Sequence, residues 1–304
     1  MPELPEVETV VRELREHLPG RDIIRASLTA SDLYRRGSAK ISALAGAHIE
    51  GVNRRGKAIV VSLRARPGKA DRLVVHLGMT GQLEWKASPG SVRDNPKHLH
   101  ARIGFADGSQ LRYVDPRRFG FIFVGTAAAV AETLKMGPDP FEMDSAALAA
   151  KLTRRSAPIK SLLLDQHLIS GLGNIYVDEV LHLAHIHPLL SGDRAAKEAG
   201  AILEAARSTL SRAIAARGTT IRDYRRTDGA TGEFQIKLSV YGRDGEKCPR
   251  CGSSIKRIVV SQRGTHFCPR CQRAPRLSAR KGETLRAGRS RREAPRPADY
   301  KPSR

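Results

Sequence analysis

The sequence predicts an α+β protein of several domains: a helix with an antiparallel β-sandwich first, a helical domain next and a zinc ribbon last. Three observations predict this order. Short strand-like segments separated by turns occupy residues 21–125, and helical spacing of apolar residues replaces them from about Ala127. Four cysteines lie together between residues 248 and 271. The length of 304 residues agrees with about two domains that have cores of their own.

The first residues predict a helix. Pro5 suits the first helical turn, and Glu6 and Glu8 suit its positive end. The helix should end at Pro19-Gly20. Up to that point the apolar residues keep helical spacing, at Val7, Val10, Val11, Leu14 and Leu18.

The region that follows predicts the strands of a sandwich or barrel. Asp107-Gly108 lies between two strand-like runs and is typical of a hairpin turn. Strands and helices do not alternate here, which argues against a Rossmann-type parallel sheet. The runs are short and rich in apolar or β-branched residues: Ala58–Leu63, Leu73–Leu77, Ala101–Phe105, Leu111–Val114 and Phe119–Val124.

A rigid Gly-Pro-Asp-Pro connection at residues 137–140 leads into the predicted helical domain. Its helices are expected at Ser145–Leu152, Ile159–Leu164, Asn174–Ala184 and Ala195–Arg217. The segment SGLGN, residues 170–174, is a tight glycine-rich turn that opens the third of these helices. Free N–H groups at such a helix start bind phosphate, so Asn174 is a candidate contact to a nucleic-acid backbone.

The cysteines predict one structural zinc ion. Cys248-x2-Cys251 and Cys268-x2-Cys271 are separated by 16 residues, the spacing of two knuckles that bind one tetrahedral Zn²⁺. No cysteine is spare to open a catalytic position; two disulfides or free thiols are the alternative. Between the pairs, Ile255–Val260 and Thr265–Phe267 predict a hairpin with Arg263 at its tip.

The charge predicts a polyanionic partner. There are 53 Lys and Arg against 31 Asp and Glu, a net charge of +22, which suits nucleic acid or an anionic membrane. A mean hydropathy of −0.37 and the short apolar runs argue against an integral membrane protein. The N-terminus does not have the pattern of a secretory signal, so we expect a cytoplasmic protein. The last 33 residues hold 11 Lys and Arg and 3 acidic residues, and we expect them to be disordered.

The N-terminus carries a candidate nucleophile. Removal of the initiator methionine would leave Pro2 with a free secondary amine, and α-amino groups titrate near pH ~8. Such an amine can attack a sugar carbon and form a Schiff base, with the carboxylate of Glu3 beside it to transfer protons. The alternative is an ordinary terminal proline without a catalytic role.

Several separated motifs together resemble one family. MPELPEVET (1–9), HLGMTG (76–81), DPRRFG (115–120), GLGNIY (171–176) and QRGTHFCPRCQ (262–272) resemble bacterial formamidopyrimidine-DNA glycosylase, of the Fpg/Nei family, over residues 2–272. The resemblance implies a β-sandwich catalytic domain, a helix–two-turn–helix domain and a zinc ribbon, with DNA between the two main domains. The expected divisions are 1–130, 131–225, a lesion-capping loop region at 226–245, the ribbon at 246–272 and a basic tail at 273–304.

The resemblance also implies roles for individual residues. Pro2 would be the nucleophile, Glu3 the general acid and base, Lys57 a proton-transfer group in β-elimination, and Arg263 a phosphate contact that assists δ-elimination. Met79, Arg117 and Phe119 would fill the gap left by the extruded base, with Arg117 pairing with the orphaned cytosine. His98, Lys160 and Asn174 would contact phosphates. Ser156 stands where some relatives carry a lysine, so one phosphate contact departs from the family pattern.

The implied function is a bifunctional glycosylase and AP lyase of base-excision repair. It would remove 8-oxoguanine and formamidopyrimidines from double-stranded DNA, also cleave abasic sites, act as a monomer and need only structural Zn²⁺. Two alternatives stay open: an endonuclease VIII-like enzyme for oxidised pyrimidines, and a zinc-ribbon DNA-binding protein without chemistry. The segment beyond Gln272 is longer than the family pattern and is expected to add non-specific DNA affinity.

Overall fold

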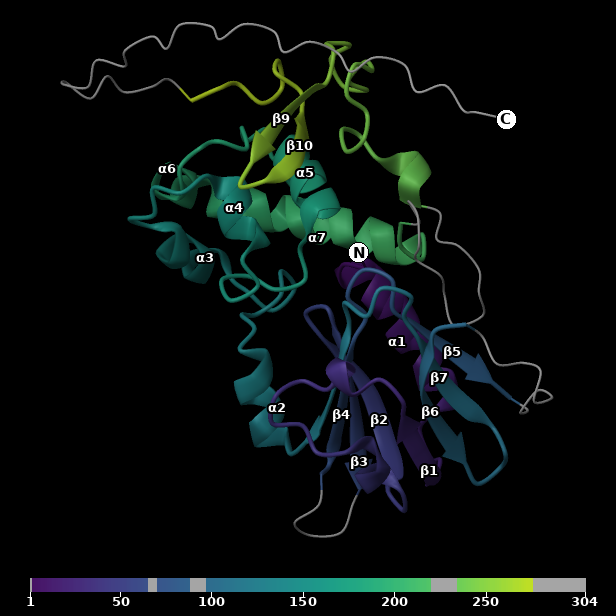
Figure 1. The fold of residues 1–304 in the computed structure, drawn as a ribbon. Helices are drawn as coiled ribbons and strands as arrows, with labels where there is room; N and C mark the ends of the chain where they lie inside the picture. The colour runs from purple at the N-terminus through teal and green to yellow at the C-terminus, as the bar shows by residue number, and fades with distance from the viewer. Residues whose placement is uncertain (1, 65–69, 88–96, 220–233, 276–304) are drawn as a thin grey trace, which may run out of the picture.

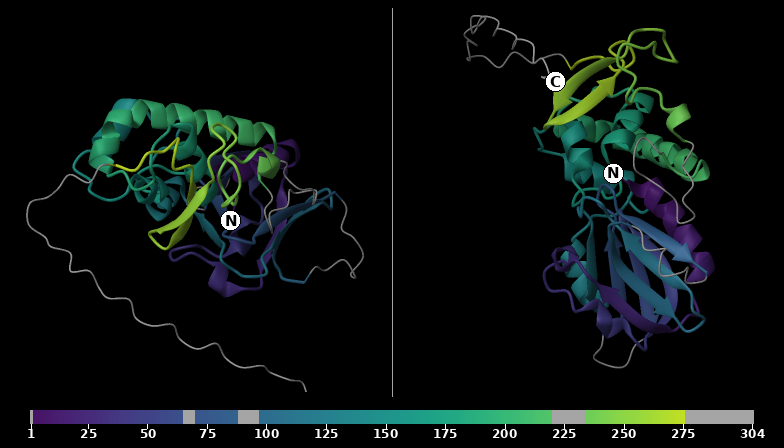
Figure 2. Two further views of the ribbon diagram at one scale, coloured as in Figure 1. Left: turned by 90° about the horizontal axis from the view of Figure 1, so that it is seen from above. Right: turned by 45° about the vertical axis from the view of Figure 1, so that its right-hand side comes forward.

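The computed structural model describes residues 2–64, 70–87, 97–219 and 234–275. They form two main parts, and the N-terminus lies where these parts meet (Figure 1). The purple-to-blue part is the β-sandwich, and the teal-to-green part is helical, with the yellow zinc-ribbon hairpin beside it. Both turned views keep this two-part arrangement (Figure 2). Residues 226–233 of the expected capping region and 276–304 of the expected tail lie outside the described residues.

The first part is a sandwich of two four-stranded antiparallel sheets, as the sequence predicts. Their strand orders are β2-β3-β4-β8 and β1-β6-β7-β5. The first sheet contains β2 (His48–Arg55), β3 (Ala58–Arg64), β4 (Arg72–His76) and β8 (Phe121–Gly125). The second contains β1 (Ile23–Leu28), β6 (Leu99–Phe105), β7 (Gln110–Val114) and β5 (Gln82–Lys86).

Strand β3 shows why the strands of this region have continuous apolar sequences. Ile59, Val61 and Leu63 face the core that the two sheets share with helix α1 (Leu4–His17). Ala58 faces the other way, into a smaller apolar cluster with helix α2 (Ala127–Leu134). Both faces of the sheet are therefore covered, and the strand does not alternate strictly between apolar and polar residues.

The predicted strand at Phe119–Val124 is wrong at its start. Strand β8 begins at Phe121, and Phe119 lies before it in a loop with 55% of its surface exposed. The backbone of Arg118 is left-handed, with φ of 52°, which is incompatible with an extended strand. Three strands, β1, β2 and β5, and helix α2 were not individually delimited from the sequence.

The helical part has its own core, built by α3 (Ser145–Leu152), α4 (Ile159–Leu164), α5 (Asn174–Leu183), α6 (Gly192–Ala195) and α7 (Ala199–Ala215). Helix α3 has the predicted bounds. Its start is fixed by the carboxylate of Asp144, which accepts a 2.7 Å hydrogen bond from the backbone of Ala147. The helix predicted at Ala195–Arg217 is divided: α6 and a 3-10 turn at Ala196–Glu198 precede α7. Further 3-10 turns lie at Ser31–Leu33, Ile41–Leu44 and Phe234–Lys237.

The last described element is the predicted hairpin of the ribbon. Strands β9 (Lys256–Val260) and β10 (Arg263–Phe267) pair antiparallel. The two residues between them, Ser261 and Gln262, have φ of 47° and 60°, which matches the twist of a tight two-residue hairpin.

Within the described ranges, none of the helices has the length and apolar character needed to cross a bilayer.

Candidate active site

The N-terminus lies where the two parts of the protein meet. Glu3 precedes α1, and its carboxylate accepts hydrogen bonds from the backbone of Gly173 at 2.7 Å and Ile175 at 3.0 Å, at the start of α5. The backbone N–H of Leu4 donates to the carbonyl of Gly171 at 3.0 Å. Pro2, next to Glu3 and buried, is thereby held at the junction.

The glycines of the SGLGN turn make this approach possible. A Cβ on Gly173 would lie 2.4 Å from the carboxyl carbon of Glu3, closer than any side chain allows. Gly171 has φ of 93°, and a Cβ there would meet the side chain of Leu4 at 2.5 Å. The turn therefore receives the N-terminus as well as opening α5.

Lys57 brings a buried amine to the same place. It lies in the turn between β2 and β3, with 4% of its surface exposed. Burial lowers the pKa of the Lys57 ammonium, and the carboxylates of Glu3 and Glu6 oppose this by raising it. The guanidinium of Arg263 lowers it further. Three separated segments of the chain thus contribute charges to one cluster.

Glu6 completes the buried charge cluster, and sequence reasoning missed it as a site residue. Its carboxylate accepts from the Tyr176 hydroxyl at 2.6 Å, from the backbone of Thr219 at 2.7 Å and from the backbone of Glu3 at 2.8 Å. Burial raises the pKa of Glu6, and these hydrogen bonds lower it. The reciprocal bonding of Glu3 and Glu6 is a capping box, which the spacing of the two glutamates could have indicated.

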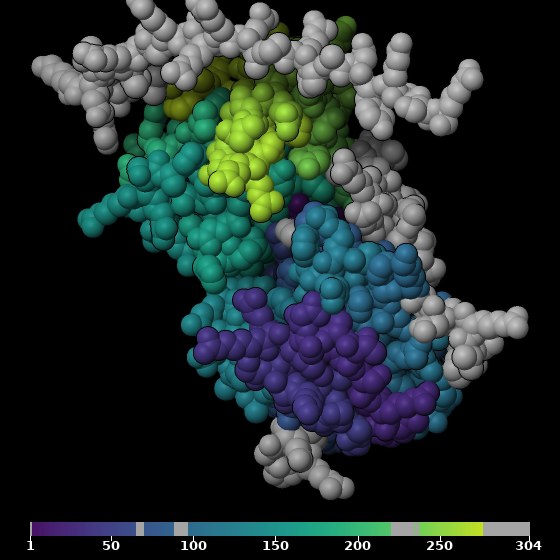
Figure 3. Space-filling model, in the orientation of Figure 1, coloured from purple at the N-terminus to yellow at the C-terminus, as the bar shows by residue number. Residues whose placement is uncertain are grey.

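The zinc-ribbon hairpin is attached to the helical part directly beside Arg263. The carbonyl of Gly264 accepts from Asn174 Nδ2 at 3.1 Å and from Lys160 Nζ at 3.1 Å. The Lys160 ammonium also donates to Asp178 at 2.7 Å, and neither side chain is exposed. Figure 3 shows the yellow hairpin extending toward the junction with the blue sandwich.

The geometry does not favour the expected phosphate contact of Lys160. Its ammonium is fully buried and bonded to protein groups, so it holds the loop that carries Arg263. Asn174 does the same through its amide nitrogen, while its side-chain oxygen is buried and has no hydrogen-bond partner among the residues that the structure describes. Asp178, the partner of Lys160, was not singled out from the sequence.

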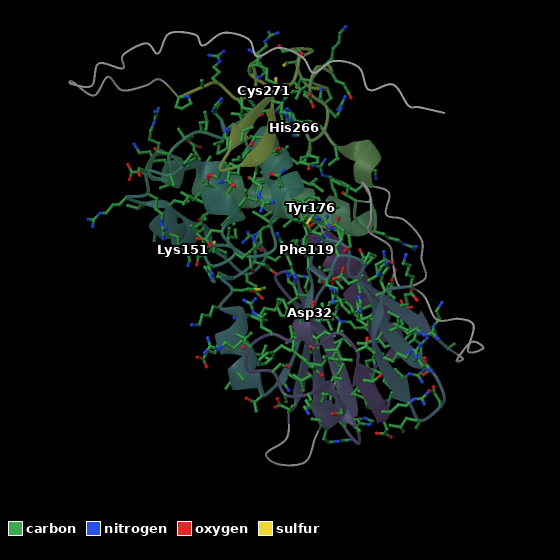
Figure 4. All side chains as sticks on the ribbon, in the orientation of Figure 1. Asp32, Phe119, Lys151, Tyr176, His266 and Cys271 are labelled. Atoms are coloured by element: carbon green, nitrogen blue, oxygen red, sulfur yellow. The ribbon has the colours of Figure 1, made fainter. Side chains whose placement is uncertain are left out.

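Met79, Arg117, Phe119 and His98 lie on loops of the sandwich. Met79 and Phe119 are large apolar side chains with 37% and 55% of their surfaces exposed. The guanidinium of Arg117 lies over the Phe119 ring, 4.6 Å from its centroid. Figure 4 labels Phe119 on the sandwich side of the junction and Tyr176 on the helical side. His98 is also exposed.

The four cysteines are gathered as a metal site requires. Their sulfur atoms all lie within 4.8 Å of one another, and none forms a disulfide. The Sγ atoms of Cys251 and Cys268 are 3.4 Å apart, and those of Cys248 and Cys271 are 4.0 Å apart. Tetrahedral zinc with Zn–S bonds of about 2.3 Å separates its sulfur ligands by about 3.8 Å. The site fits one structural zinc ion.

Comparison with known proteins identifies the family. Three family profiles match in chain order: "Formamidopyrimidine-DNA glycosylase N-terminal domain" at residues 1–122, "Formamidopyrimidine-DNA glycosylase H2TH domain" at 136–225, and "Zinc finger found in FPG and IleRS" at 245–274. The chain is 42% identical over 283 residues to the formamidopyrimidine-DNA glycosylase of Herpetosiphon aurantiacus, covering 90% of this chain and all of that protein. The chain belongs to the formamidopyrimidine-DNA glycosylase family.

Two further formamidopyrimidine-DNA glycosylases extend the comparison. That of Symbiobacterium thermophilum is 41% identical over 315 residues and covers 98% of each chain. Its match therefore extends into the basic C-terminal segment, so a long C-terminus is not peculiar to this chain. A Lactococcus lactis FPG mutant, solved in complex with Fapy-dG-containing DNA, superposes with a TM-score of 0.79 at 38% identity, covering 90% of this chain and all of that one.

Family membership establishes the activity. The protein is a bifunctional DNA glycosylase and AP lyase of base-excision repair that acts on oxidised purines in DNA. This decides against an endonuclease VIII-like enzyme and against a DNA-binding protein without chemistry. The formamidopyrimidine-DNA glycosylase fold of sandwich, helical domain and zinc ribbon is as the sequence predicted.

Proposed function

We propose that this chain excises 8-oxoguanine and formamidopyrimidines through a Schiff base on Pro2. The observation that carries the proposal is the buried pair of Glu3 and Lys57 charges beside Pro2, at the junction of the two main parts of the protein. The exposed guanidinium of Arg263 lies close enough to act on the charge of Lys57. Structures of relatives contain DNA with Fapy-dG, a carbocyclic 8-oxo-G and an abasic site, which supports the same substrates here.

The proposed first step joins enzyme and sugar. The base is flipped out of the stack at a cost of a few kcal/mol, which Met79, Arg117 and Phe119 would offset by filling the gap. The Pro2 amine attacks C1′ and the C1′–N9 bond breaks, so that the base leaves with the bonding electrons and takes up a proton. Glu3 protonates O4′ as the sugar ring opens, which leaves an iminium ion between Pro2 and C1′.

Two eliminations would then cut the strand. The iminium acidifies the C2′ proton, and its removal, with Lys57 as the proposed proton acceptor, breaks the C3′–O bond. Loss of a second proton from C4′ breaks the C5′–O bond, with Arg263 stabilising the departing phosphate. Water then hydrolyses the iminium, releases the sugar fragment and restores Pro2. The product is a one-nucleotide gap with phosphate on both sides.

The proposed chemistry has two further requirements. Met1 must be removed, because an acylated Pro2 nitrogen is an amide and not a nucleophile. All proposed catalytic groups belong to one chain, which supports action as a monomer. We also propose a cytoplasmic location, supported by the four cysteines gathered for a metal, since cytoplasmic thiols remain reduced.

The substrate assignment is tested with a panel of duplexes. Strand cleavage is measured with 8-oxoguanine opposite cytosine, 8-oxoguanine opposite adenine, and thymine glycol opposite adenine. We expect preferential cleavage of the first, with phosphate at both ends of the gap. Preferential cleavage of thymine glycol, or a product with a 3′ unsaturated aldehyde alone, would contradict the proposal.

A further inference from the structure

One buried carboxylate connects the two loops that carry Met79, Arg117 and Phe119. Asp115 has no exposed surface. Its Oδ1 accepts from the Thr80 hydroxyl at 2.5 Å and from the backbone N–H of Arg117 at 3.3 Å. Its Oδ2 accepts from the Tyr113 hydroxyl at 3.0 Å and from the backbone N–H of Gly120 at 3.0 Å. Thr80 is the neighbour of Met79, and Arg117 and Gly120 flank the exposed loop.

The backbone of Asp115 extends these connections to the expected phosphate contact. Its N–H donates to the carbonyl of His98 at 3.1 Å. Its carbonyl oxygen lies 2.9 Å from His100 Nε2 and also accepts from the backbone of Arg118 at 3.3 Å. His98 has φ of 68°, so its backbone is held in an unusual conformation at this point. One residue therefore contacts three loops of the sandwich edge.

These side-chain and backbone partners of the Asp115 carboxylate are all donors, which suits an ionised carboxylate, because it only accepts hydrogen bonds. Burial, and then the charge of Asp115, raise the pKa of Tyr113 well above that of an ordinary tyrosine, so its hydroxyl keeps its proton. Each carboxylate oxygen faces one backbone N–H. An asparagine in either orientation would therefore point its NH₂ group at an amide donor, and one loop would have to move.

The two loops also contact each other without intervening side chains. A Cβ on Gly78 would lie 2.3 Å from the carbonyl carbon of Phe119. A Cβ on Gly120 would lie 2.4 Å from the backbone oxygen of His76, directly before the loop that carries Met79. The loop that carries Met79 (residues 77–81) and the loop that carries Phe119 (residues 115–120) thus have close backbone contact and share the buried Asp115 carboxylate as an acceptor. They therefore have little freedom to move separately.

We propose that Asp115 is a positioning residue that fixes Met79, Arg117 and Phe119 relative to one another before DNA binds, and so sets selectivity for the base opposite the lesion. This inference rests on the proposed function, in which those three side chains replace the extruded base. Ordering the loops in advance removes an entropic cost from base flipping. Asp115 touches no reacting atom, and its effect reaches the DNA through the two loops.

The experiment compares two reactions of the full-length protein. Excision from 8-oxoguanine opposite cytosine needs the gap to be filled and the cytosine to be paired, whereas cleavage of a preformed abasic site needs no base extrusion. For Asp115→Asn we expect single-turnover excision to fall by about 10- to 100-fold, the range of a misplaced binding group. Abasic-site cleavage should fall by no more than about threefold, and the preference for cytosine over adenine opposite the lesion should fall by about tenfold.

Thr80 supplies a milder matched pair. Thr80→Val removes the donor to Asp115 with little change of shape, and Thr80→Ser keeps it. We expect Thr80→Val to show the same split between the two reactions, to a smaller extent, and Thr80→Ser to behave as wild type. A 2-aminopurine next to the lesion should report slower or incomplete gap filling in Asp115→Asn and Thr80→Val. If Asp115→Asn does not fold, the Thr80 pair decides the question.

A purely structural role predicts a different result. Val61→Ala, in the sandwich core away from these loops, serves as the stability control, and it should leave the ratio of the two activities unchanged. Equal losses of excision and abasic-site cleavage in Asp115→Asn, with unchanged opposite-base selectivity, would overturn the inference. Failure of the proposed function itself would be distinguishable, because the wild-type protein would then not excise 8-oxoguanine at all.

Discussion

At the scale of single residues, Glu3 is subject to two opposing effects. Backbone N–H groups at the start of α5 stabilise its negative charge, as does Lys57. Burial is the larger effect and raises the pKa of Glu3. A raised pKa leaves more of the carboxyl group protonated near neutral pH, which suits the proposed role of Glu3 as the group that donates a proton to O4′ and later accepts one.

The first prediction concerns this carboxyl group. Glu3→Gln should lower single-turnover excision of 8-oxoguanine by about 10²- to 10⁴-fold, the usual contribution of a general acid or base. Cleavage of a preformed abasic site should lose less, because its sugar already opens in water. Circular dichroism is the control for folding. Similar small losses in both reactions would show that Glu3 only caps α5.

The second prediction concerns the pH dependence of Lys57. A proton acceptor must be neutral, and the neutral fraction of an amine rises with pH through its pKa. An ordinary lysine titrates near pH ~10.4. Because burial lowers the pKa of Lys57, the rate of abasic-site β-elimination should rise with pH, and this rise should occur at a lower pH than for an ordinary lysine. Lys57→Arg keeps the positive charge and should lose this rise in the rate. A pH profile that is the same in both proteins would exclude Lys57 as the acceptor.

At the scale of elements, the zinc ribbon is joined to the helices by buried polar groups. Lys160 on α4 and Asp178 on α5 form an ion pair, and Asp178 also accepts from the backbone of His266 on β10 at 2.8 Å. Removing one member of such a pair leaves an uncompensated buried charge, at a cost of about 3–5 kcal/mol. The position of Arg263 therefore depends on both the zinc ion and this pair.

The third prediction follows from that dependence. Binding of a structural zinc ion supplies the folding free energy of a small ribbon. Chelation should release one zinc ion per chain and weaken binding to abasic-site DNA by at least about tenfold, as expected when an interfacial charge is removed. The sandwich should keep its β-sheet signal. The control, Arg263→Ala, should keep its zinc and show a similar loss of affinity.

Restored zinc should restore binding of the chelated protein. Unchanged DNA affinity after complete zinc release would contradict the dependence of DNA binding on a folded ribbon. Zinc content, circular dichroism and a binding titration at one salt concentration measure these outcomes.

Elements with local signals were predictable from the sequence, and those fixed by distant contacts were not. Helix α3 begins after Asp144 and α4 after Pro158, and both were predicted with the bounds that the structure has. The first strand of the ribbon hairpin, β9, was predicted within one residue at its start. Only two residues of strand β2, Ile49 and Val52, are buried and apolar, and most of the others are polar and exposed or half-buried, so its pattern did not stand out.

The same distinction applies to the candidate site. Motif resemblance indicated Pro2, Glu3 and Arg263, and the cysteine spacing indicated the zinc ligands. Sequence could not show that Lys160 is buried against Asp178, 18 residues away, or that Asp115 bonds to Thr80, 35 residues away. These contacts depend on how α5 and the sandwich loops pack. Asp115 lies inside the DPRRFG motif, but only its exposed neighbours indicated a function from the sequence.

At the scale of the whole molecule, two of the sets of contacts among the described residues link the sandwich to the helical part. The N-terminal residues bond to the SGLGN turn, and Arg54 on β2 forms ion pairs at 2.9 Å with Glu8 on α1 and with Asp139 of the connection. Pro2, the proposed nucleophile, thus begins the segment that links the two main parts of the protein. Because Lys57 belongs to the sandwich and the Arg263 hairpin is bonded to the helical part, a shift between the parts would move Pro2 relative to one of these two residues.

The fourth prediction concerns the basic C-terminus. Residues 274–304 carry ten Lys and Arg and three acidic residues. Deleting them should weaken binding to undamaged duplex and reduce the salt slope of log K by about 0.9 for each phosphate that the segment neutralises. The single-turnover excision rate at saturating enzyme should not change. An unaltered affinity and salt slope would assign the segment a role other than DNA binding.

The most direct test of the central claim is borohydride trapping. The purified protein is incubated with a duplex that contains one 8-oxoguanine opposite cytosine, reduced with borohydride and digested, and the cross-linked peptide is sequenced by mass spectrometry. We expect a covalent adduct on the peptide that begins at Pro2 without Met1. An adduct on Lys57, or no adduct despite tight binding, would contradict the assignment of Pro2 as the nucleophile.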